Sequence, residues 1–358
     1  MKKFVLFSFV LLSVCLVNAS TKFYDATQFP LLGKGVGHTS KPYNRLPDSL
    51  ENITRKPVWN LSLNSAGMAV RFASNSTEIK ASWKSTQGNK MNHMTEAGTR
   101  GLDLYVLGDD GRWAFAGSGR PKVDSLKNTV SIIANMAPKE REYMLYLSLY
   151  DGVDSLYIGI DSAATISQPK VNLPKREKPI VFYGTSILQG GCASRPGMAH
   201  TNILERWLNR ETINFGFSGN GQLDLEVAEV IKNIDAGMFI LDFVPNASVQ
   251  QMNEKMVRFY KIIRDAHPTT PMIFLEDPRF PSAKFDDKMR SEVAKKNATV
   301  GRIFNEMKAA GDKNIYFLRS DKMIGTDNEA TVDGIHFTDL GFMRYCDFIL
   351  PTIKKHLK

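Results

Sequence analysis

The chain has 358 residues, of which 43% are hydrophobic and 23% are charged. This length favours two domains over one, and the composition lets each domain bury an ordinary core. The formal net charge is +9 at pH 7, but the lysines and arginines are scattered among acidic residues. Scattered charge argues against a groove that follows nucleic-acid phosphates, so we expect no nucleic-acid partner.

The first residues, MKKFVLFSFVLLSVCLVNAS, combine two lysines, a short apolar run and small residues near Ala19. This order is typical of a secretory signal, so we expect residues 1–19 to be removed and the protein to be periplasmic or secreted. The alternative is a membrane anchor, but the apolar run falls short of the roughly 20 residues that a spanning helix needs. We therefore expect no stable membrane insertion.

Residues 20–170 alternate between apolar and polar positions, with turn signals such as SNST, GDDGRW and YDGVDS between the runs. A period of two residues is typical of strands that bury one face. We therefore predict a jelly-roll-like β-sandwich for this half. The apolar positions at strand spacing are Val70, Phe72, Ile79, Ala81, Trp83, Tyr143, Leu145, Leu147 and Leu149.

The stretch SQPKVNLPKREKP, rich in proline and charge, predicts a linker into a second domain, residues 171–358. There, short apolar segments alternate with amphipathic ones, which indicates a parallel sheet covered by helices on both faces. The predicted strands contain IVFYGTS, TINFGFS, GMFILDF, PMIFLED and NIYFLRS, and the predicted helices include 200–208, 223–233, 249–266 and a final one from 339. Sites in such sheets form beyond the carboxyl ends of the strands.

Ser186 follows the first of these strands, in FYGTSILQGG. A serine becomes a nucleophile when a base takes its proton, and TVDGIHFTDLGF places Asp333 and His336 on one short loop. Their spacing lets the carboxylate contact one imidazole nitrogen while the other nitrogen faces the serine. Taken alone, the pair is more readily explained as a turn-forming aspartate and an ordinary loop histidine.

Acyl transfer also needs hydrogen-bond donors for the oxyanion. Gly219 follows the second strand in GFSGNG, where a backbone N–H can approach closely, and Asn246 follows the third strand in LDFVPNAS, with an amide that can donate. Each has a structural alternative, a glycine in a turn and an asparagine that caps the next helix. Together with Ser186 and the histidine loop they lie at one edge of one predicted sheet, which favours a catalytic site.

These four blocks, with GTSI first and DGIH last, resemble in their order the SGNH hydrolases, also called GDSL esterases, over roughly residues 176–358. The resemblance implies a flavodoxin-like three-layer α/β/α domain with Ser186 as nucleophile, His336 as base and Asp333 as the acid that orients the base. It also implies an oxyanion hole made of the Ser186 N–H, the Gly219 N–H and the Asn246 amide. The first block has GTS in place of GDS, and the third has PN in place of GxND, which leaves the geometry of the Asn246 loop open.

The segment RGLDLYVL, residues 100–107, looks like the G-x-D-L-Y signature of a β-domain that accompanies one branch of bacterial SGNH hydrolases. The resemblance marks Gly101, Asp103 and Tyr105 as signature positions and assigns them no role.

Ser218 is a rival nucleophile, because GFSGN differs from the G-x-S-x-G elbow of α/β-hydrolases only by Asn220 in place of the last glycine. The SGNH order accounts for Gly219 and Asn246, whereas the elbow accounts for neither. Ser186 is therefore the favoured nucleophile.

Arg195 and His200 in GCASRPGMAH and Arg279 in EDPRF are candidates for substrate binding, and each is at least as readily a loop or helix-start residue. No metal-binding motif and no glycine-rich phosphate loop occurs, so we expect no metal and no cofactor. Cys192 has no second base beside it in sequence and is not expected to be a nucleophile. Export permits a disulfide between Cys192 and Cys346, but their separation in sequence leaves it open.

Together these features predict an exported serine esterase. The resemblance to SGNH hydrolases, together with export, implies short acyl esters as substrates, with acetyl esters of carbohydrates as the leading ones. An acyltransferase with the same triad would differ only in the acceptor that reaches the acyl-enzyme. A third alternative is a carbohydrate-binding protein with an inactive hydrolase-like domain, which would use aromatic residues such as Trp83, Tyr105 and Trp113. The complete triad favours an enzyme, and the oligomeric state has no signal in the sequence.

Overall fold

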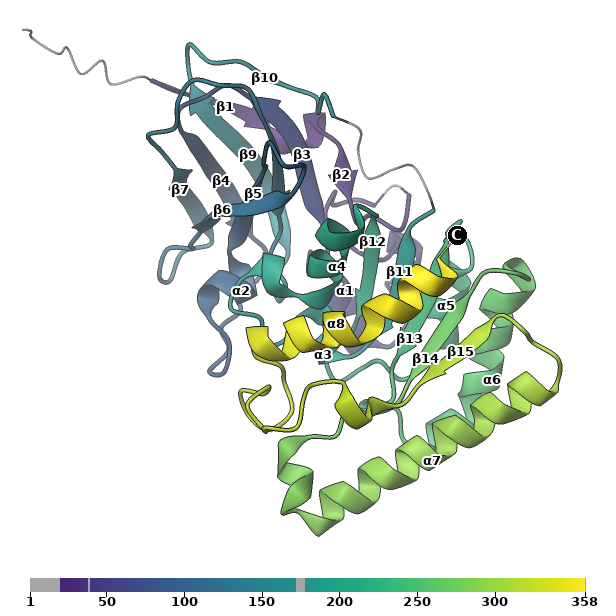
Figure 1. Ribbon diagram of the computed structural model, residues 1–358. Coiled ribbons are helices and arrows are strands. Elements are labelled where there is room, and N and C mark those ends of the chain that lie inside the picture. Colours follow the sequence, from purple (N-terminus) through teal and green to yellow (C-terminus); the bar gives the residue numbers. More distant parts are fainter. Residues whose placement is uncertain (1–19, 38, 172–177, 358) are drawn as a thin grey trace, which may run out of the picture.

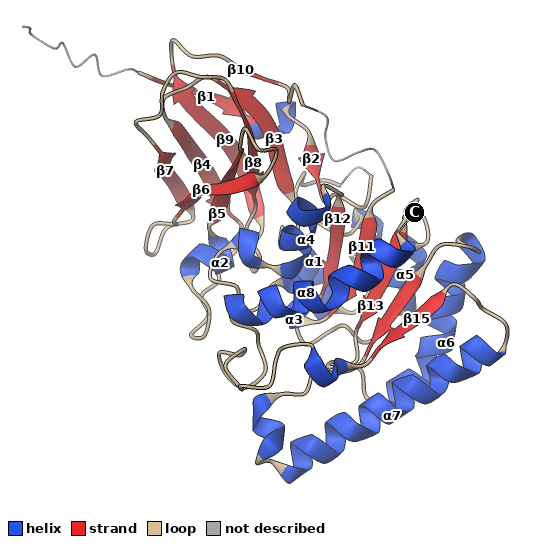
Figure 2. Cartoon of the chain, in the orientation of Figure 1, coloured by secondary structure: helices blue, strands red, loops and turns tan. Residues whose placement is uncertain are grey.

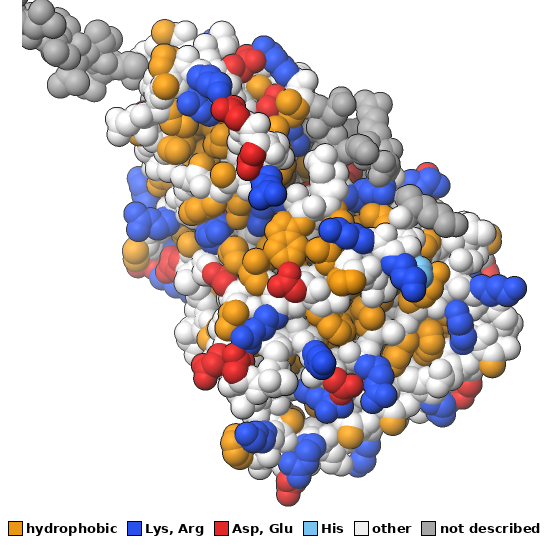
Figure 3. All heavy atoms as spheres, viewed as in Figure 1, with side chains coloured by type: hydrophobic (Ala, Val, Ile, Leu, Met, Phe, Trp, Pro, Cys, Tyr) orange, Lys and Arg blue, Asp and Glu red, His pale blue; other side chains and the backbone are white. Residues whose placement is uncertain are grey.

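The computed structural model describes residues 20–37, 39–171 and 178–357, which form two adjoining halves (Figure 1). The predicted secretory segment and the middle of the predicted linker lie outside the described residues. Among the helices that are described, none is both long and apolar enough to cross a membrane. On the face seen in Figure 3, basic and acidic side chains lie among one another, as the scattered charge predicts.

The N-terminal half consists of two antiparallel sheets packed face to face, in agreement with the predicted sandwich (Figure 2). The first sheet has the order β1 (Thr21–Asp25), β9 (Val153–Asp161), β4 (Ile79–Ser85) and β7 (Lys127–Ile133). The second has the order β10 (Ile166–Ser167), β3 (Ala69–Ser74), β8 (Arg141–Tyr146), β5 (Leu102–Leu107) and β6 (Trp113–Gly119), with β2 (Leu31–Leu32) paired to β3. Strand β4 alternates buried and half-buried residues along its length, as its sequence predicts.

The aromatic residues of this half serve mainly to pack the sandwich. Trp83 is buried and its indole N–H donates to the carbonyl of Arg100. Tyr105 is also buried, and the half-buried Trp113 stacks against the guanidinium of Arg71. These three aromatics therefore do not form the exposed platform that a carbohydrate-binding module would use.

The C-terminal half is a three-layer α/β/α domain, as predicted. Its parallel sheet has the order β12 (Thr212–Gly216), β11 (Ile180–Gly184), β13 (Met238–Asp242), β14 (Met272–Leu275) and β15 (Ile315–Leu318). This is the flavodoxin-like strand order. Val181 and Tyr183 of β11 face one helical layer while Ile180 and Phe182 face the other, so the strand is apolar throughout.

Helices cover both faces of this sheet (Figure 2). One face packs against α5 (Leu225–Ile231), α6 (Val249–Ala266), α7 (Asp287–Ala309) and α1 (Lys56–Ser62), and the other against α3 (Ser186–Gln189), α4 (His200–Leu208) and α8 (Asp339–His356). The helix α2 (Glu96–Arg100) lies in the N-terminal half. Short 3-10 turns cover Ala26–Gln28, Asp48–Leu50, Pro196–Met198, Pro281–Lys284 and Ser320–Lys322.

Residues 33–37 and 39–65 precede most of the sandwich in sequence but pack on the parallel sheet. Val58 and Trp59 of α1 share a core with the strands β11 and β12. Arg45 is buried and donates to the carbonyls of Asn214 (3.1 Å) and Gly216 (2.6 Å) in β12. The two halves are therefore joined by a buried interface as well as by the linker.

Candidate active site

Ser186 begins α3 directly after β11, at the carboxyl edge of the parallel sheet. Its carbonyl accepts hydrogen bonds from the Gly191 N–H (2.9 Å) and from the hydroxyl of Tyr150 (2.8 Å). Tyr150 belongs to the N-terminal half, so both halves hold the backbone of this serine. The residue is 7% exposed, which leaves its hydroxyl in a sheltered position.

The loop before α8 brings His336 and Asp333 to Ser186. His336 Nε2 lies 2.9 Å from Ser186 Oγ, and His336 Nδ1 lies 2.7 Å from Asp333 Oδ2. The other carboxylate oxygen accepts from the backbone N–H groups of Ile335 and His336, which fixes the carboxylate within a tight turn. The three side chains thus form a continuous hydrogen-bonded chain of the kind that activates a serine.

The carboxylate of Asp333 is stabilised in its charged form. Burial alone would raise its pKa, but the hydrogen bonds from the His336 ring and from the backbone of His336 and Ile335 lower the pKa to about 2. Asp333 is therefore ionised at neutral pH and can stabilise a positive charge on the adjacent imidazole.

Gly219 and Asn246 follow the neighbouring strands β12 and β13. Gly219 has φ +67° and no atom lies within 4 Å of a Cβ placed on it, so the backbone conformation rather than crowding favours glycine. The Asn246 side-chain oxygen accepts a hydrogen bond from the Gly221 N–H (3.2 Å), which turns the amide nitrogen away from that contact and leaves it free to donate.

One cavity of about 420 Å³ is lined by Ser186, Gly219, Asn246 and His336. This cavity is small and concave, as expected of a site for a small ligand. Donors beside the serine can face the oxygen of a carbonyl that the serine attacks. The other lining residues mix apolar and charged side chains: Ile187, Ser218, Pro245, Asp277, Phe280, Met289, Glu292, Val293, Lys296 and Ile335.

Ser218, the rival nucleophile, lines the same cavity without a base. Its N–H donates to the side-chain oxygen of Gln189 (3.0 Å), and in the described part of the chain no histidine is hydrogen-bonded to it. Gln189 is buried and donates in turn to the carbonyl of Leu149 (3.1 Å) and to Asn64 (3.0 Å). Gln189 therefore ties the turn that carries Gly219 to the N-terminal half.

Arg195 has partners of its own, in the G-x-D-L-Y segment. It donates to the carboxylate of Asp103 (2.8 Å) and to the hydroxyl of Tyr105 (2.7 Å), and the Gly197 N–H donates to the same carboxylate (2.8 Å). Asp103 is completely buried, and burial raises its pKa although Arg195 opposes the shift. The signature thus fastens β5 to the loop after α3, and Arg195 serves this contact instead of the predicted substrate contact.

The structure also corrects the prediction for His200. His200 is completely buried against Phe342 and Tyr345, and burial lowers its pKa to about 3, so it has no surface to offer a substrate. Arg279 pairs with Asp321 and lines a cavity next to the one that contains Ser186, and its contact with a substrate stays a prediction.

Cys192 and Cys346 are free, buried thiols, so the disulfide left open by the sequence is not formed. Burial, together with the charge of Asp333, raises the pKa of Cys192 to about 12. Cys192 is therefore a neutral thiol at neutral pH, which argues against a nucleophilic role.

Three residues near the site escape sequence reasoning: His93, Tyr150 and Gln189. The His93 ring lies beside that of His336, with ring centroids 5.3 Å apart. His93 and Tyr150 come from the N-terminal half, and their sequence neighbours form no motif. Only the docking of the two halves brings them to Ser186, so a single sequence carries no signal for them.

Comparisons with known proteins cover both halves. A family model of GDSL-like lipases and acylhydrolases matches residues 177–354, and a GxDLY model, described as the N-terminus of SGNH-hydrolase-type esterases, matches residues 21–166. No curated protein matches the chain.

Among solved structures, a GDSL-like lipase from Bacteroides ovatus ATCC 8483 is 37% identical, with 94% of this chain and 98% of that chain covered and a TM-score of 0.90. Two others share the fold at low identity. The salicylyl-acyltransferase SsfX3 from a tetracycline biosynthetic pathway is 15% identical, with 94% and 99% covered and a TM-score of 0.76. A family two carbohydrate esterase from Cellvibrio japonicus is 12% identical, with 94% and 98% covered and a TM-score of 0.60.

The likeness to the Bacteroides protein extends over nearly the whole of both chains, and the two family models match the two halves in order. The chain therefore belongs to the GDSL-like lipase/acylhydrolase family, with the GxDLY N-terminal domain of SGNH-type esterases, and is a hydrolase that acts on ester bonds.

Proposed function

We propose that this protein is an exported serine esterase that removes short acyl groups, chiefly acetyl, from carbohydrates. The observation that carries the proposal is the hydrogen-bonded chain from Ser186 through His336 to Asp333, which opens into a cavity shared with Gly219 and Asn246. No metal or cofactor takes part in the proposed reaction.

In the first half of the reaction, His336 Nε2 takes the proton of Ser186 as Ser186 Oγ attacks the ester carbonyl. The Ser186 and Gly219 N–H groups and the Asn246 amide stabilise the negative charge that develops on the carbonyl oxygen. Asp333 stabilises the imidazolium, which then gives its proton to the departing alcohol. An acyl group remains on Ser186.

In the second half, water enters in place of the alcohol. His336 takes a proton from this water, the resulting hydroxide attacks the acyl carbonyl, and the same donors stabilise the second oxyanion. The imidazolium then returns the proton to Ser186 Oγ, and the carboxylic acid leaves.

A polar hollow beside the catalytic cavity supports a carbohydrate as the alcohol. This hollow shares Ser218 with the cavity and is lined by several amide side chains that can hydrogen-bond to sugar hydroxyls. The amides come from both halves: Asn60, Asn64, Gln87, Asn89 and Asn220. The family two carbohydrate esterase of the same fold adds support for this substrate class.

The test is hydrolysis of 4-nitrophenyl acetate and release of acetate from an acetylated polysaccharide by wild type, Ser186→Ala and Ser218→Ala proteins. We expect Ser186→Ala to abolish both reactions and Ser218→Ala to retain most of the activity, with circular dichroism as the check on folding. Activity that survives Ser186→Ala would refute the proposed nucleophile. Transfer of acetyl to an added alcohol in preference to water would favour an acyltransferase.

A further inference from the structure

His93, Cys192 and His336 come from three distant parts of the sequence and meet at the edge of the active site. Each offers one metal-ligating atom, and these atoms all lie within 4.8 Å of one another. His93 belongs to the N-terminal half, whereas Cys192 follows α3 and His336 precedes α8. The cluster therefore exists only when the two halves are docked.

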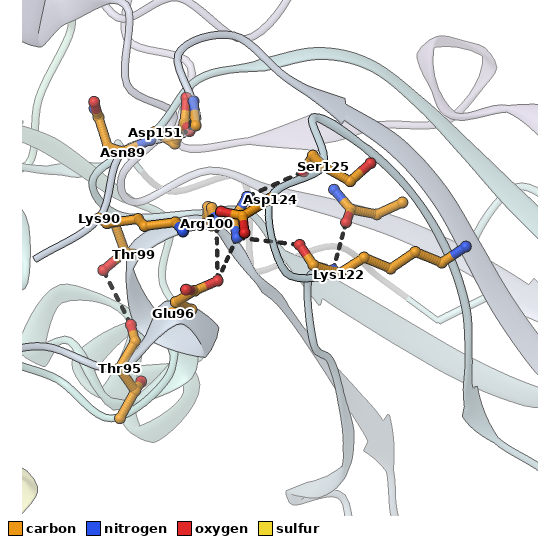
Figure 4. Close-up of polar contacts among 12 residues, drawn as sticks. Asn89, Lys90, Thr95, Glu96, Thr99, Arg100, Lys122, Asp124, Ser125 and Asp151 are labelled. Carbon is orange, nitrogen blue, oxygen red and sulfur yellow. Dashed lines mark hydrogen bonds and ion pairs between the residues drawn. The ribbon is translucent and has the colours of Figure 1, made fainter.

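The segment that carries His93 is held at both ends, near Asp151 and at Thr95. Figure 4 labels these two residues. On one side, the carboxylate of Asp151 accepts from the backbone N–H groups of Gln87, Gly88 and Asn89. On the other, Thr95 caps α2 by accepting from the Gly98 N–H. Because this segment is already anchored, it would lose little conformational entropy when His93 binds a ligand.

The α2 helix itself is fixed by its last residue. The buried guanidinium of Arg100 pairs with Glu96 and donates to the carbonyls of Ser125 (3.0 Å) and Lys122 (3.1 Å), as Figure 4 shows. The C-terminal end of α2 is therefore tied to the turn between β6 and β7.

The hydrogen bonds already present determine which atoms are available. His336 Nδ1 contacts the Asp333 carboxylate, so a metal would bind Nε2 in place of Ser186 Oγ. His93 Nδ1 lies 3.1 Å from Asn92 Oδ1, which leaves its Nε2 for the metal. Two imidazole nitrogens and one cysteine sulfur are ligands typical of Zn²⁺. Asp333 behind His336 has the place of the carboxylate that orients many zinc-binding histidines.

We propose that His93, Cys192 and His336 form a reversible Zn²⁺ site, and that bound zinc inhibits the esterase by occupying the nitrogen that activates Ser186. The inhibitory part rests on the proposed function. Zinc would be bound by His93 Nε2, His336 Nε2 and the Cys192 thiolate, with the thiol proton released to solvent and water as the fourth ligand. The hydrogen bond from Ser186 Oγ to His336 Nε2, 2.9 Å long, is then lost, and the serine has no base.

Binding and inhibition are measured separately. Zinc affinity is determined by competition with a chromophoric zinc indicator for the full chain, using wild type, Ser186→Ala, His93→Ala and Cys192→Ser proteins. His356→Ala is the matched control, since His356 lies at the end of α8 against Tyr316, outside the cluster. Esterase activity is then measured with micromolar zinc and after addition of a chelator.

We expect His356→Ala to bind zinc with the affinity of wild type, and Ser186→Ala to bind at least as tightly, because it lacks the hydrogen bond that zinc displaces. His93→Ala and Cys192→Ser should bind at least about tenfold more weakly. Zinc should inhibit wild type, the chelator should restore it, and His93→Ala should remain active at zinc concentrations that inhibit wild type. Because His93 packs against the ring of His336, the inhibition of each variant is expressed relative to its own activity without zinc.

Equal zinc affinity for wild type and His93→Ala would overturn the site, and binding that leaves wild-type activity unchanged would overturn the inhibition. If wild type shows no esterase activity at all, the proposed function fails and the inhibition fails with it. The indicator measurement on the variants still decides the zinc site in that case, because it needs no turnover.

Discussion

At the scale of single residues, Asp333 is the group whose charge the proposed mechanism needs most directly. Asp333→Asn keeps the size of the side chain but removes the carboxylate that faces His336 Nδ1. We expect kcat to fall on the order of 10³–10⁴-fold with little change in KM, because the imidazole loses both its orientation and its counter-charge. Steady-state kinetics on an acetyl ester measures this, with the exposed Asp347→Asn as control. A loss below tenfold would contradict the assigned role.

Asp277 gives a second prediction, for stability. It lines the catalytic cavity but is only 2% exposed. Burial raises its pKa to about 7, although Lys296, 4.0 Å away, acts to lower the pKa. The folded-state pKa of Asp277 lies above its unfolded value of about 4, so the folded protein binds this proton more tightly than the unfolded chain does. Its contribution to the free energy of unfolding is therefore fully present below about pH 4 and is lost as pH rises through 7.

Asp277→Asn removes this titration while keeping the shape of the side chain. We expect the variant to gain stability over wild type between pH 4 and pH 8, by up to about 4 kcal/mol at the upper end. Urea unfolding at a series of pH values measures the difference, again with Asp347→Asn as control. A difference that does not change with pH would show that Asp277 does not titrate in this way.

At the scale of elements, the sequence predicts well whatever depends on local pattern. The helices α4 and α6 have the predicted bounds, and α6 begins where Ser248 and Gln251 form a capping box. The edge of the sheet that carries Ser186, Gly219 and the histidine loop was also predictable, because parallel strands place their carboxyl ends together.

Contacts between distant elements had no such local signal. Three features depend on how the helices and strands pack against one another: the position of residues 39–65 on the parallel sheet, the burial of His200 and the pairing of Arg195 with Asp103. Their sequence positions near the site predict substrate contacts for Arg195 and His200, whereas packing pairs Arg195 with Asp103 and buries His200.

The Arg195–Asp103 contact between β5 and the loop after α3 provides the third prediction. Arg195→Met leaves the fully buried Asp103 carboxylate without its cation, and we expect a loss of about 3–5 kcal/mol in the free energy of unfolding. Asp103→Asn in the same background should recover part of this loss, since no buried charge then remains unpaired. A double-mutant cycle by urea unfolding tests the coupling, and additive effects of the two changes would contradict it.

At the scale of the whole molecule, the two halves share structure that neither could satisfy alone. Arg45 donates to carbonyls of Leu61 and Asn64 in its own half and to Asn214 and Gly216 of the parallel sheet. Tyr150 holds the carbonyl of the catalytic serine candidate from the other half. The active site is therefore a product of the interface, although all three proposed triad residues lie in one half.

This interface predicts that the halves unfold together. We expect one thermal transition for the full chain, with the calorimetric enthalpy equal to the van't Hoff enthalpy, and loss of esterase activity over the same temperatures. Arg45→Met should lower the midpoint of that single transition, because it leaves buried carbonyls at both sides of the interface without a donor. Two separate transitions, with only the first shifted by Arg45→Met, would contradict this prediction. They would mean that the sandwich and the α/β domain unfold independently and that the interface adds little to the stability of either.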